Sequence, residues 1–106
     1  MIEKITIDNF VRDLVANFHP VRVTLFGSYS NGKATEDSDV DLLVELPMVR
    51  PGLADAASMV STLKPGFMVD LIVRTPEQVN LRIAQGDHFL KQAVQNGKLL
   101  YETADA

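Results

Sequence analysis

The segment that decides the fold is residues 25–44, LFGSYSNGKATEDSDVDLLV. It has the pattern of an apolar strand, a glycine turn, a polar connection and a second strand that opens with two aspartates. Asp39 and Asp41 are two residues apart, so on a strand both carboxylates point to one face while Val40 points to the other. Paired carboxylates repel each other unless a cation lies between them, and hard oxygen ligands suit Mg²⁺. The segment therefore predicts a divalent-cation site where a strand begins.

A glycine turn lies immediately upstream of the paired aspartates. Gly27 lets backbone amides come close to a phosphate, and successive amides form an anion-binding nest. Ser28 adds a hydroxyl, and residues 28–33 are expected to form a short helical turn. An ordinary turn between strands is the alternative, which the nearby aspartates disfavour. Ser38 is a weaker phosphate candidate, since its hydroxyl could instead satisfy a local backbone amide. Tyr29 is expected either to contact a base or a partner, or to shield the turn.

A third acidic residue interrupts a later apolar run. Asp70 lies within residues 68–73, MVDLIV, and burying an ionised carboxylate there is costly without a partner. It is therefore expected at an exposed edge or next to a cation or base. The alternative for the Asp39-Val40-Asp41 motif is a solvated loop end. An active site is favoured by three features: the apolar residues that follow, the upstream Gly-Ser turn and Asp70. Further acids, Glu36, Asp37 and Glu45, add to the local negative charge that suits a cation.

The motif resembles the signature of a known enzyme superfamily. Gly27-Ser28, ten intervening residues and Asp39-Val40-Asp41 are similar to the nucleotidyltransferase superfamily that includes DNA polymerase beta. The short chain more closely resembles the minimal nucleotidyltransferases, the antitoxin partners of HEPN toxins, over almost its whole length. Ser30 and Asn31 depart from the alanine and arginine of many relatives, which affects contacts along the triphosphate or the partner surface.

The resemblance implies the roles of the site residues and the reaction. Catalysis and the binding of two Mg²⁺ ions fall to three aspartates, Asp39, Asp41 and Asp70. Nucleotide binding falls to Gly27, Ser28 and Ser38. The implied enzyme is a Mg²⁺-dependent protein adenylyltransferase of the EC 2.7.7 type. It would transfer AMP from ATP to a tyrosine hydroxyl of a HEPN ribonuclease toxin, so that it acts as the antitoxin in a hetero-oligomer.

Two other functions stay open at this level. The chain could neutralise a toxin by direct contact without catalysis, or it could be a nucleotidyltransferase acting on a small molecule. Larger relatives carry a second domain that binds the acceptor, and 106 residues leave no room for one. We therefore expect another protein chain to present the acceptor, which favours the toxin partner.

Composition sets the class of protein. The 106 residues predict one domain, residues 1–106, and 46% hydrophobic with 23% charged residues indicates a packed core rather than disorder. The net charge of −4 disfavours bulk nucleic-acid binding, and the absence of cysteine excludes disulfides and thiolate zinc sites. Neither a leader nor a membrane-spanning run is evident, so a soluble cytoplasmic protein is expected.

The periodicity of apolar residues predicts the α/β (α+β) nucleotidyltransferase fold, a small mixed β-sheet of three to four strands flanked by helices. Helices are expected over residues 6–18, 53–63, 75–85 and 87–97, and strands over residues 21–26, 40–46, 68–73 and 99–101. Thr6 or Asp8 is expected to cap the first helix. The buried face of the second is expected to contain Leu53, Ala56, Ala57, Val60 and Leu63. Residues 103–106 are expected to fray.

Overall fold

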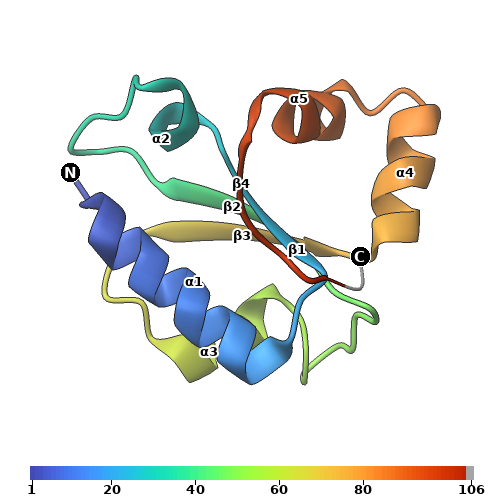
Figure 1. Ribbon diagram of the computed structural model, residues 1–106, viewed down its shortest axis with the longest axis horizontal. Coiled ribbons are helices and arrows are strands. Elements are labelled where there is room, and N and C mark those ends of the chain that lie inside the picture. Colours follow the sequence, from blue (N-terminus) through green and yellow to red (C-terminus); the bar gives the residue numbers. More distant parts are fainter. Residues whose placement is uncertain (105–106) are drawn as a thin grey trace.

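A four-stranded mixed sheet forms the centre of the computed structural model, which describes residues 1–104 (Figure 1). The strand order is β3-β2-β1-β4. β2 is parallel to β3 and antiparallel to β1, and β1 is also antiparallel to β4. The predicted mixed sheet is confirmed, including its fourth strand. The strands are β1 (Arg22–Phe26), β2 (Val40–Glu45), β3 (Val69–Arg74) and β4 (Lys98–Glu102).

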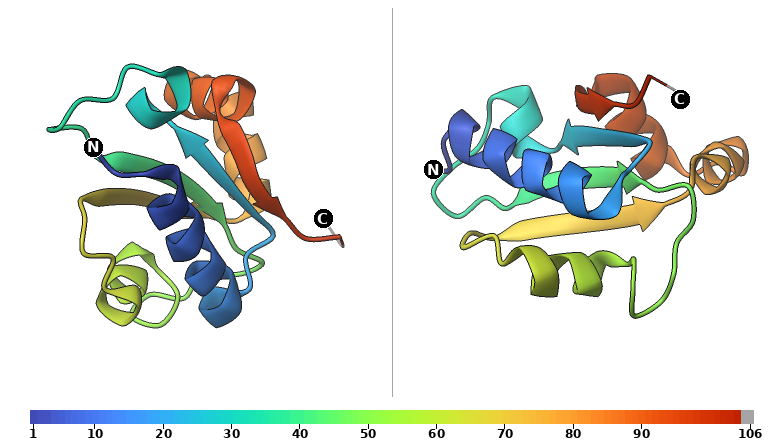
Figure 2. Two further views of the ribbon diagram at one scale, coloured as in Figure 1. Left: turned by 60° about the vertical axis from the view of Figure 1, so that its left-hand side comes forward. Right: turned by 60° about the horizontal axis from the view of Figure 1, so that its bottom comes forward.

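Helices cover both faces of this sheet. α1 and α3 lie on one face and α4 and α5 on the other, with the short α2 beside the end of β1 (Figures 1 and 2). In the described residues no helix combines the length and the apolar character needed to cross a membrane. The helices are α1 (Lys4–Phe18), α2 (Ser28–Asn31), α3 (Ala56–Leu63), α4 (Pro76–Ala84) and α5 (His88–Asn96).

The alternation of side chains along β2 divides the core in two. Val40, Leu42 and Val44 pack in the larger core towards α1 and α3, whereas Leu43 packs in the smaller core towards α4 and α5. Because successive residues point to opposite faces, Asp41 shares the α4/α5 face with Leu43. Every residue of β2 except Asp41 is buried, as expected of a central strand.

Helix ends and phases agree with the predictions only in part. The predicted capping box of α4 is confirmed, with Thr75 accepting from the backbone of Gln78 and Gln78 accepting in return. The predicted caps Thr6 and Asp8 are wrong, because α1 begins at Lys4 and its N-cap, Glu3, makes no side-chain cap.

The predicted buried face of α3 is wrong in part, since Ala56 and Leu63 pack against the larger core and the other members do not. The helix begins only at Ala56, so Leu53 lies before it and is exposed, as is Val60. Met59 is fully buried instead. Ala56, Met59 and Leu63 are spaced by three and four residues, so they also form one face of a helix. The sequence alone did not distinguish this face from the predicted one.

The predicted fraying of residues 103–106 is wrong at its start, where the Thr103 amide donates to the Val21 carbonyl at 2.9 Å. Residues 105 and 106 lie outside the described part of the chain.

Glu45 does not belong to the acidic group around the aspartate motif. It lies at the far end of β2, where its buried carboxylate pairs with the Arg22 guanidinium at 3.0 Å. Arg22 also pairs with Glu102 of β4 at 2.7 Å, so one guanidinium joins the ends of three adjacent strands. The predicted contribution of Glu45 to a cation site is therefore wrong.

We expect Arg22→Met to lower the free energy of unfolding by about 3 kcal/mol, because it leaves the Glu45 carboxylate buried without a partner. Urea denaturation at pH 7 measures this. The double variant Arg22→Met/Glu45→Met should recover most of the loss, since it removes the unpaired charge. A single variant as stable as the wild type would show that Arg22 does not compensate the charge of Glu45.

Asp55, the N-cap of α3, provides a pH-dependent prediction. Its carboxylate accepts from the Ser58 hydroxyl at 2.6 Å, the Gly52 amide at 2.8 Å and the Ser58 amide at 2.9 Å. These bonds, the Ser58 hydroxyl first, lower the pKa of Asp55 from 3.8 to about 2. A lowered carboxyl pKa stabilises the folded state above the ordinary pKa, and this contribution is lost as the pH falls through the folded value.

Asp55→Ala should therefore lower the melting temperature at pH 7, and the difference from the wild type should shrink as the pH falls from about 4 to about 2. Thermal unfolding followed by circular dichroism at a series of pH values checks this. Asp55→Asn keeps a capping oxygen without the charge and is the matched control. A difference that stays constant down to pH 2 would contradict the role of the ionised carboxylate.

Candidate active site

The sheet brings the three predicted aspartates to one corner. Asp41 on β2 is the register partner of Asp70 on the adjacent parallel strand β3. Ile72, two residues beyond Asp70, packs in the α4/α5 core, so Asp70 and Asp41 belong to the same face of the sheet. Asp39 lies one residue before β2 and two before Asp41. Residues about thirty apart in the sequence therefore meet at the beginnings of two neighbouring strands.

The electrostatics agree with this placement. Burial raises the pKa of the half-buried Asp41 above its ordinary value, and the charges of Asp70 and then Asp39 raise it further. Asp39 and Asp70 are exposed. Asp70 lies at an exposed edge, which is one of the two environments predicted for it, because β3 is an outer strand of the sheet; an adjacent cation stays a prediction.

The donor set fits a hard divalent cation. Three carboxylates that repel one another gain from a cation among them, and Mg²⁺ prefers carboxylate oxygen together with water and substrate phosphates. Among residues 1–104, however, no three His, Cys, Asp or Glu side chains are arranged to hold a metal ion by themselves. Carboxylates on two strands supplemented by phosphate oxygens are the usual form of such a Mg²⁺ site, and a complete protein cage is not required.

Gly27 allows Asp41 to take its position. Phe26 pairs with Asp41 across β1 and β2, which places Gly27 against the carboxylate. A Cβ atom at residue 27 would overlap Asp41 Oδ2. The backbone there also has φ +74° and ψ −154°, a region open essentially to glycine alone. Both the approach of the carboxylate and the backbone conformation therefore require glycine.

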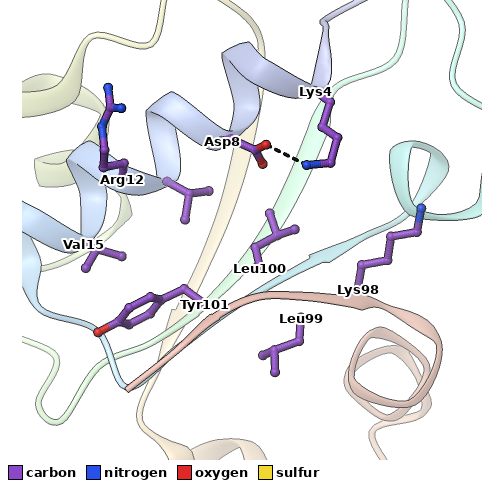
Figure 3. A pocket seen from close by; sticks show the side chains of 9 residues that line it. Lys4, Asp8, Arg12, Val15, Lys98, Leu99, Leu100 and Tyr101 are labelled. Carbon is purple, nitrogen blue, oxygen red and sulfur yellow. Dashed lines mark hydrogen bonds and ion pairs between the residues drawn. The ribbon is translucent and has the colours of Figure 1, made fainter. Parts of the chain in front are cut away.

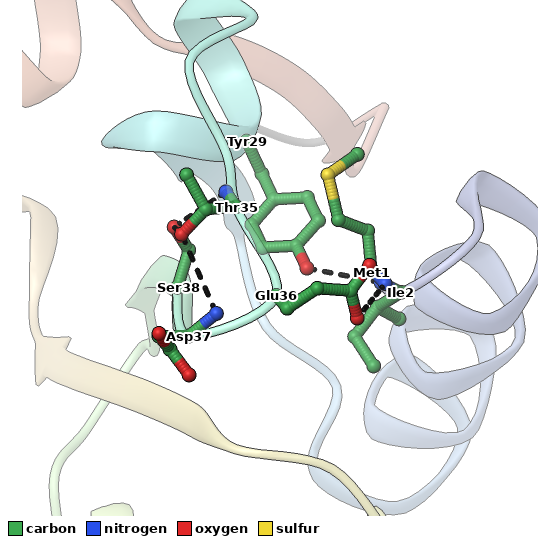
Figure 4. Close-up of polar contacts among 7 residues, drawn as sticks. All are labelled: Met1, Ile2, Tyr29, Thr35, Glu36, Asp37 and Ser38. Carbon is green, nitrogen blue, oxygen red and sulfur yellow. Dashed lines mark hydrogen bonds and ion pairs between the residues drawn. The ribbon is translucent and has the colours of Figure 1, made fainter.

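The two predicted serines lie on either side of this corner. Ser28 opens α2 directly after Gly27 and is half-buried. Ser38 precedes Asp39, and its hydroxyl accepts from the Thr35 amide at 2.9 Å (Figure 4). The local backbone contact foreseen for Ser38 is thus present, whereas phosphate contact by Ser28 or Ser38 stays a prediction.

Tyr29 is half-buried and connects α2 to the N-terminal segment, whereas contact with a base or a partner stays a prediction. Its hydroxyl accepts from the Ile2 amide at 2.9 Å, and its ring packs against the larger core (Figure 4). The adjoining loop is held as well, because the Met1 amino group pairs with Glu36 at 2.8 Å.

A pocket of about 270 Å³ lies next to Gly27 and was not predicted from the sequence. One wall comes from Phe26 to Asn31 and the other from one face of α5. The sequence indicates this pocket only weakly. Phe89 is an aromatic residue at an exposed helix position, but the sequence does not show that α5 lies beside the glycine turn. Gly97 makes this possible, since its Cβ would overlap the backbone of Leu25, whereas the sequence suggested only a helix stop.

A larger groove, of about 890 Å³, lies between α1 and β4 and contains none of the three aspartates (Figure 3). Basic residues and an ion pair of Lys4 with Asp8 mark its rim, and Leu100 and Tyr101 project into it (Figure 3). It is therefore separate from the candidate active site.

Comparison with known families decides the class of protein. Residues 6–101 match the model of the family described as "Nucleotidyltransferase domain". The chain belongs to this nucleotidyltransferase family. It is 30% identical over 103 residues to a Methanocaldococcus jannaschii protein called "Putative protein adenylyltransferase", covering 95% of this chain and 100% of that protein. A second protein of that organism with the same description is 36% identical over 55 residues, which is 49% of this chain and 55% of that protein.

Solved structures show the same fold. A crystal structure of a toxin–antitoxin with AMP-PNP is similar at a TM-score of 0.59 and 27% identity, over 92% of this chain and 75% of that chain. A mutant of the MntA-HpeT toxin–antitoxin has a TM-score of 0.55 at 27% identity, over 99% of this chain and 76% of that chain. A Sulfolobus solfataricus protein, at 23% identity and a TM-score of 0.61 over 92% of this chain and 78% of that chain, supports the fold alone. The predicted nucleotidyltransferase fold is confirmed.

Gly27→Ala should displace the Asp41 carboxylate and force alanine into a glycine-only conformation. We expect a loss of about 1–3 kcal/mol in the free energy of unfolding and a loss of nucleotidyl transfer in the protein that remains folded. Urea denaturation and an assay with labelled ATP measure the two effects. Gly32→Ala is the matched control, because it also has positive φ but open space around the missing Cβ. Full activity in folded Gly27→Ala would contradict the role of this close approach.

Proposed function

We propose that this nucleotidyltransferase transfers AMP from ATP to a tyrosine hydroxyl of a partner protein, a HEPN ribonuclease toxin, and thereby acts as its antitoxin. The observation that carries the proposal is the register pairing of Asp41 with Asp70 beside Gly27. The protein adenylyltransferase relatives favour AMP transfer to protein. The toxin–antitoxin neighbours, one with an ATP analogue, favour ATP and a toxin.

The three aspartates, Asp39, Asp41 and Asp70, would hold two Mg²⁺ ions. When bound, the ions would neutralise the triphosphate and lower the pKa of the attacking hydroxyl. The exposure of Asp39 and Asp70 leaves both carboxylates open to substrate. The Asp41 carboxylate is half-buried next to Gly27, which fixes its position.

In the proposed reaction the tyrosine oxygen attacks the α-phosphorus of ATP. The new O–P bond forms as the bond from the α-phosphorus to the bridging oxygen breaks, and pyrophosphate leaves. The hydroxyl proton passes to Asp70, whose exposed position at the sheet edge suits a base that faces the acceptor. Backbone amides at Gly27 and Ser28 and the hydroxyl of Ser38 would bind the triphosphate.

We further propose that residues 1–106 act as one minimal domain and that the toxin itself presents the acceptor. An AMP group on a toxin tyrosine adds bulk and a negative charge. Near an RNA-binding surface that charge repels the phosphate backbone, so that modification would lower RNA binding and cleavage.

Asp39→Asn/Asp41→Asn should reduce transfer of AMP from α-labelled ATP to the toxin by about a hundredfold or more, because charge stabilisation at the phosphate is lost. Mass spectrometry of the toxin tyrosine provides the readout. The variant should be no less stable than the wild type, since it removes carboxylates that repel each other. Asp37→Asn, a change of an exposed acid in the same loop, is the control and should keep full activity.

The same experiment separates the alternatives. Inhibition of the toxin by the wild-type protein without any modified tyrosine would establish a non-catalytic binder, for which the groove between α1 and β4 offers a contact surface. Turnover with a small alcohol and no protein would establish a small-molecule enzyme. Unchanged tyrosine modification by the folded double variant would refute the proposed site.

A further inference from the structure

The pocket beside Gly27 continues directly from the carboxylate site. Phe26 and Gly27 line it, and these residues also contact the Asp41 position, through the pairing of Phe26 with Asp41 and the approach of Gly27 to its carboxylate. Phe26 belongs to the smaller core on the α4/α5 face, which is the face of the aspartates. A nucleotide with its phosphates at the aspartates can therefore extend into this pocket.

The opposite wall is one face of α5. Phe89, Gln92, Ala93 and Asn96 are spaced by three, one and three residues, so they follow one side of the helix, and all four line the pocket. The Ser30 hydroxyl donates to the Asn96 carbonyl at 3.4 Å, which joins α2 to the end of α5 across the pocket. Phe89 is 59% exposed, yet the edge-to-face contact with Phe26, at 5.6 Å between ring centroids and 88°, orients its ring.

The two amides of this wall form a pair that leaves one amide nitrogen and one amide oxygen entirely unused. Asn96 Nδ2 donates to Gln92 Oε1. That bond leaves the Gln92 amide nitrogen as a donor and the Asn96 amide oxygen as an acceptor. Reversing both amides exchanges the two roles but again leaves one amide nitrogen and one amide oxygen unused, so the pattern does not depend on how oxygen and nitrogen are assigned.

Charge indicates which part of a nucleotide fits here. None of the residues that line the pocket is charged. A phosphate would find no cation to pair with, whereas a neutral aromatic ring would find an aromatic face and two amides. Stacking of a base on an aromatic side chain is favourable enough to decide where a flexible nucleotide places its base.

From these features we infer that the pocket binds the base of the nucleotide substrate, with Phe89 stacking on the ring and Gln92 and Asn96 reading its edge. The base they fit is adenine, whose Hoogsteen edge presents one acceptor beside one donor, whereas the same edge of guanine presents two acceptors. This inference rests on the proposed function and adds to it the residues that select ATP.

Titration calorimetry with Mg²⁺ tests the inference, with ATP, GTP and inorganic tripolyphosphate as ligands. Phe89→Ala should weaken ATP binding by about tenfold or more and leave tripolyphosphate binding unchanged, because only ATP carries a base. Phe89→Trp should retain ATP binding, since it keeps a stacking face. Gln92→Leu should reduce the preference for ATP over GTP severalfold. Leu53→Ala, a change of an exposed residue before α3, is the matched control.

Each outcome has one meaning. Wild-type ATP affinity in folded Phe89→Ala, with tripolyphosphate still bound, would overturn the base pocket and leave the proposed function intact. Absence of binding of both ATP and tripolyphosphate to the wild type would refute the proposed function itself. If Phe89→Ala kept the wild-type affinity for ATP but had a raised KM for the acceptor protein, the pocket would be assigned to the acceptor and the inference would be overturned.

Discussion

The arrangement of the candidate site depends on the close approach of the Asp41 carboxylate to Gly27. Asp41 is half-buried on the central strand, next to Asp70 in register, and it fits only because residue 27 has no Cβ. Burial, and then the like charges of Asp70 and Asp39, raise the pKa of Asp41, so the arrangement costs stability in the isolated chain. Such a cost is common where a protein prepares a site for a cationic ligand.

The rest of the sheet supplies the stability that this corner lacks. β2 is otherwise buried on both faces, between the core under α1 and α3 and the core under α4 and α5. At its far end, Arg22 satisfies Glu45 and holds β4 to the sheet. Repulsive charges therefore lie at one end of the strand and a compensated ion pair lies at the other, so that the strand register is fixed independently of the active site.

The sequence predicted features that depend on local spacing and missed those that depend on packing. The two-residue spacing of Asp39 and Asp41 required a shared face, and the apolar run after Asp41 required a central strand. The phase of α3 was missed because two stripes were equally apolar, and only contact with the sheet selects Met59. Glu45 was misassigned because its partner, Arg22, is distant in sequence. The pocket on α5 was missed because it forms only when Gly97 lets that helix approach β1.

Asp70 has a second consequence, which arises from its strand. β3 is an outer strand, and its free edge offers unpaired backbone groups to any other extended chain. A charge on such an edge opposes the addition of strands from neighbouring copies, so the Asp70 carboxylate also protects this edge from strand pairing. The carboxylate proposed to accept the acceptor's proton is then also the charge that protects the edge, so replacing Asp70 would change both properties at once.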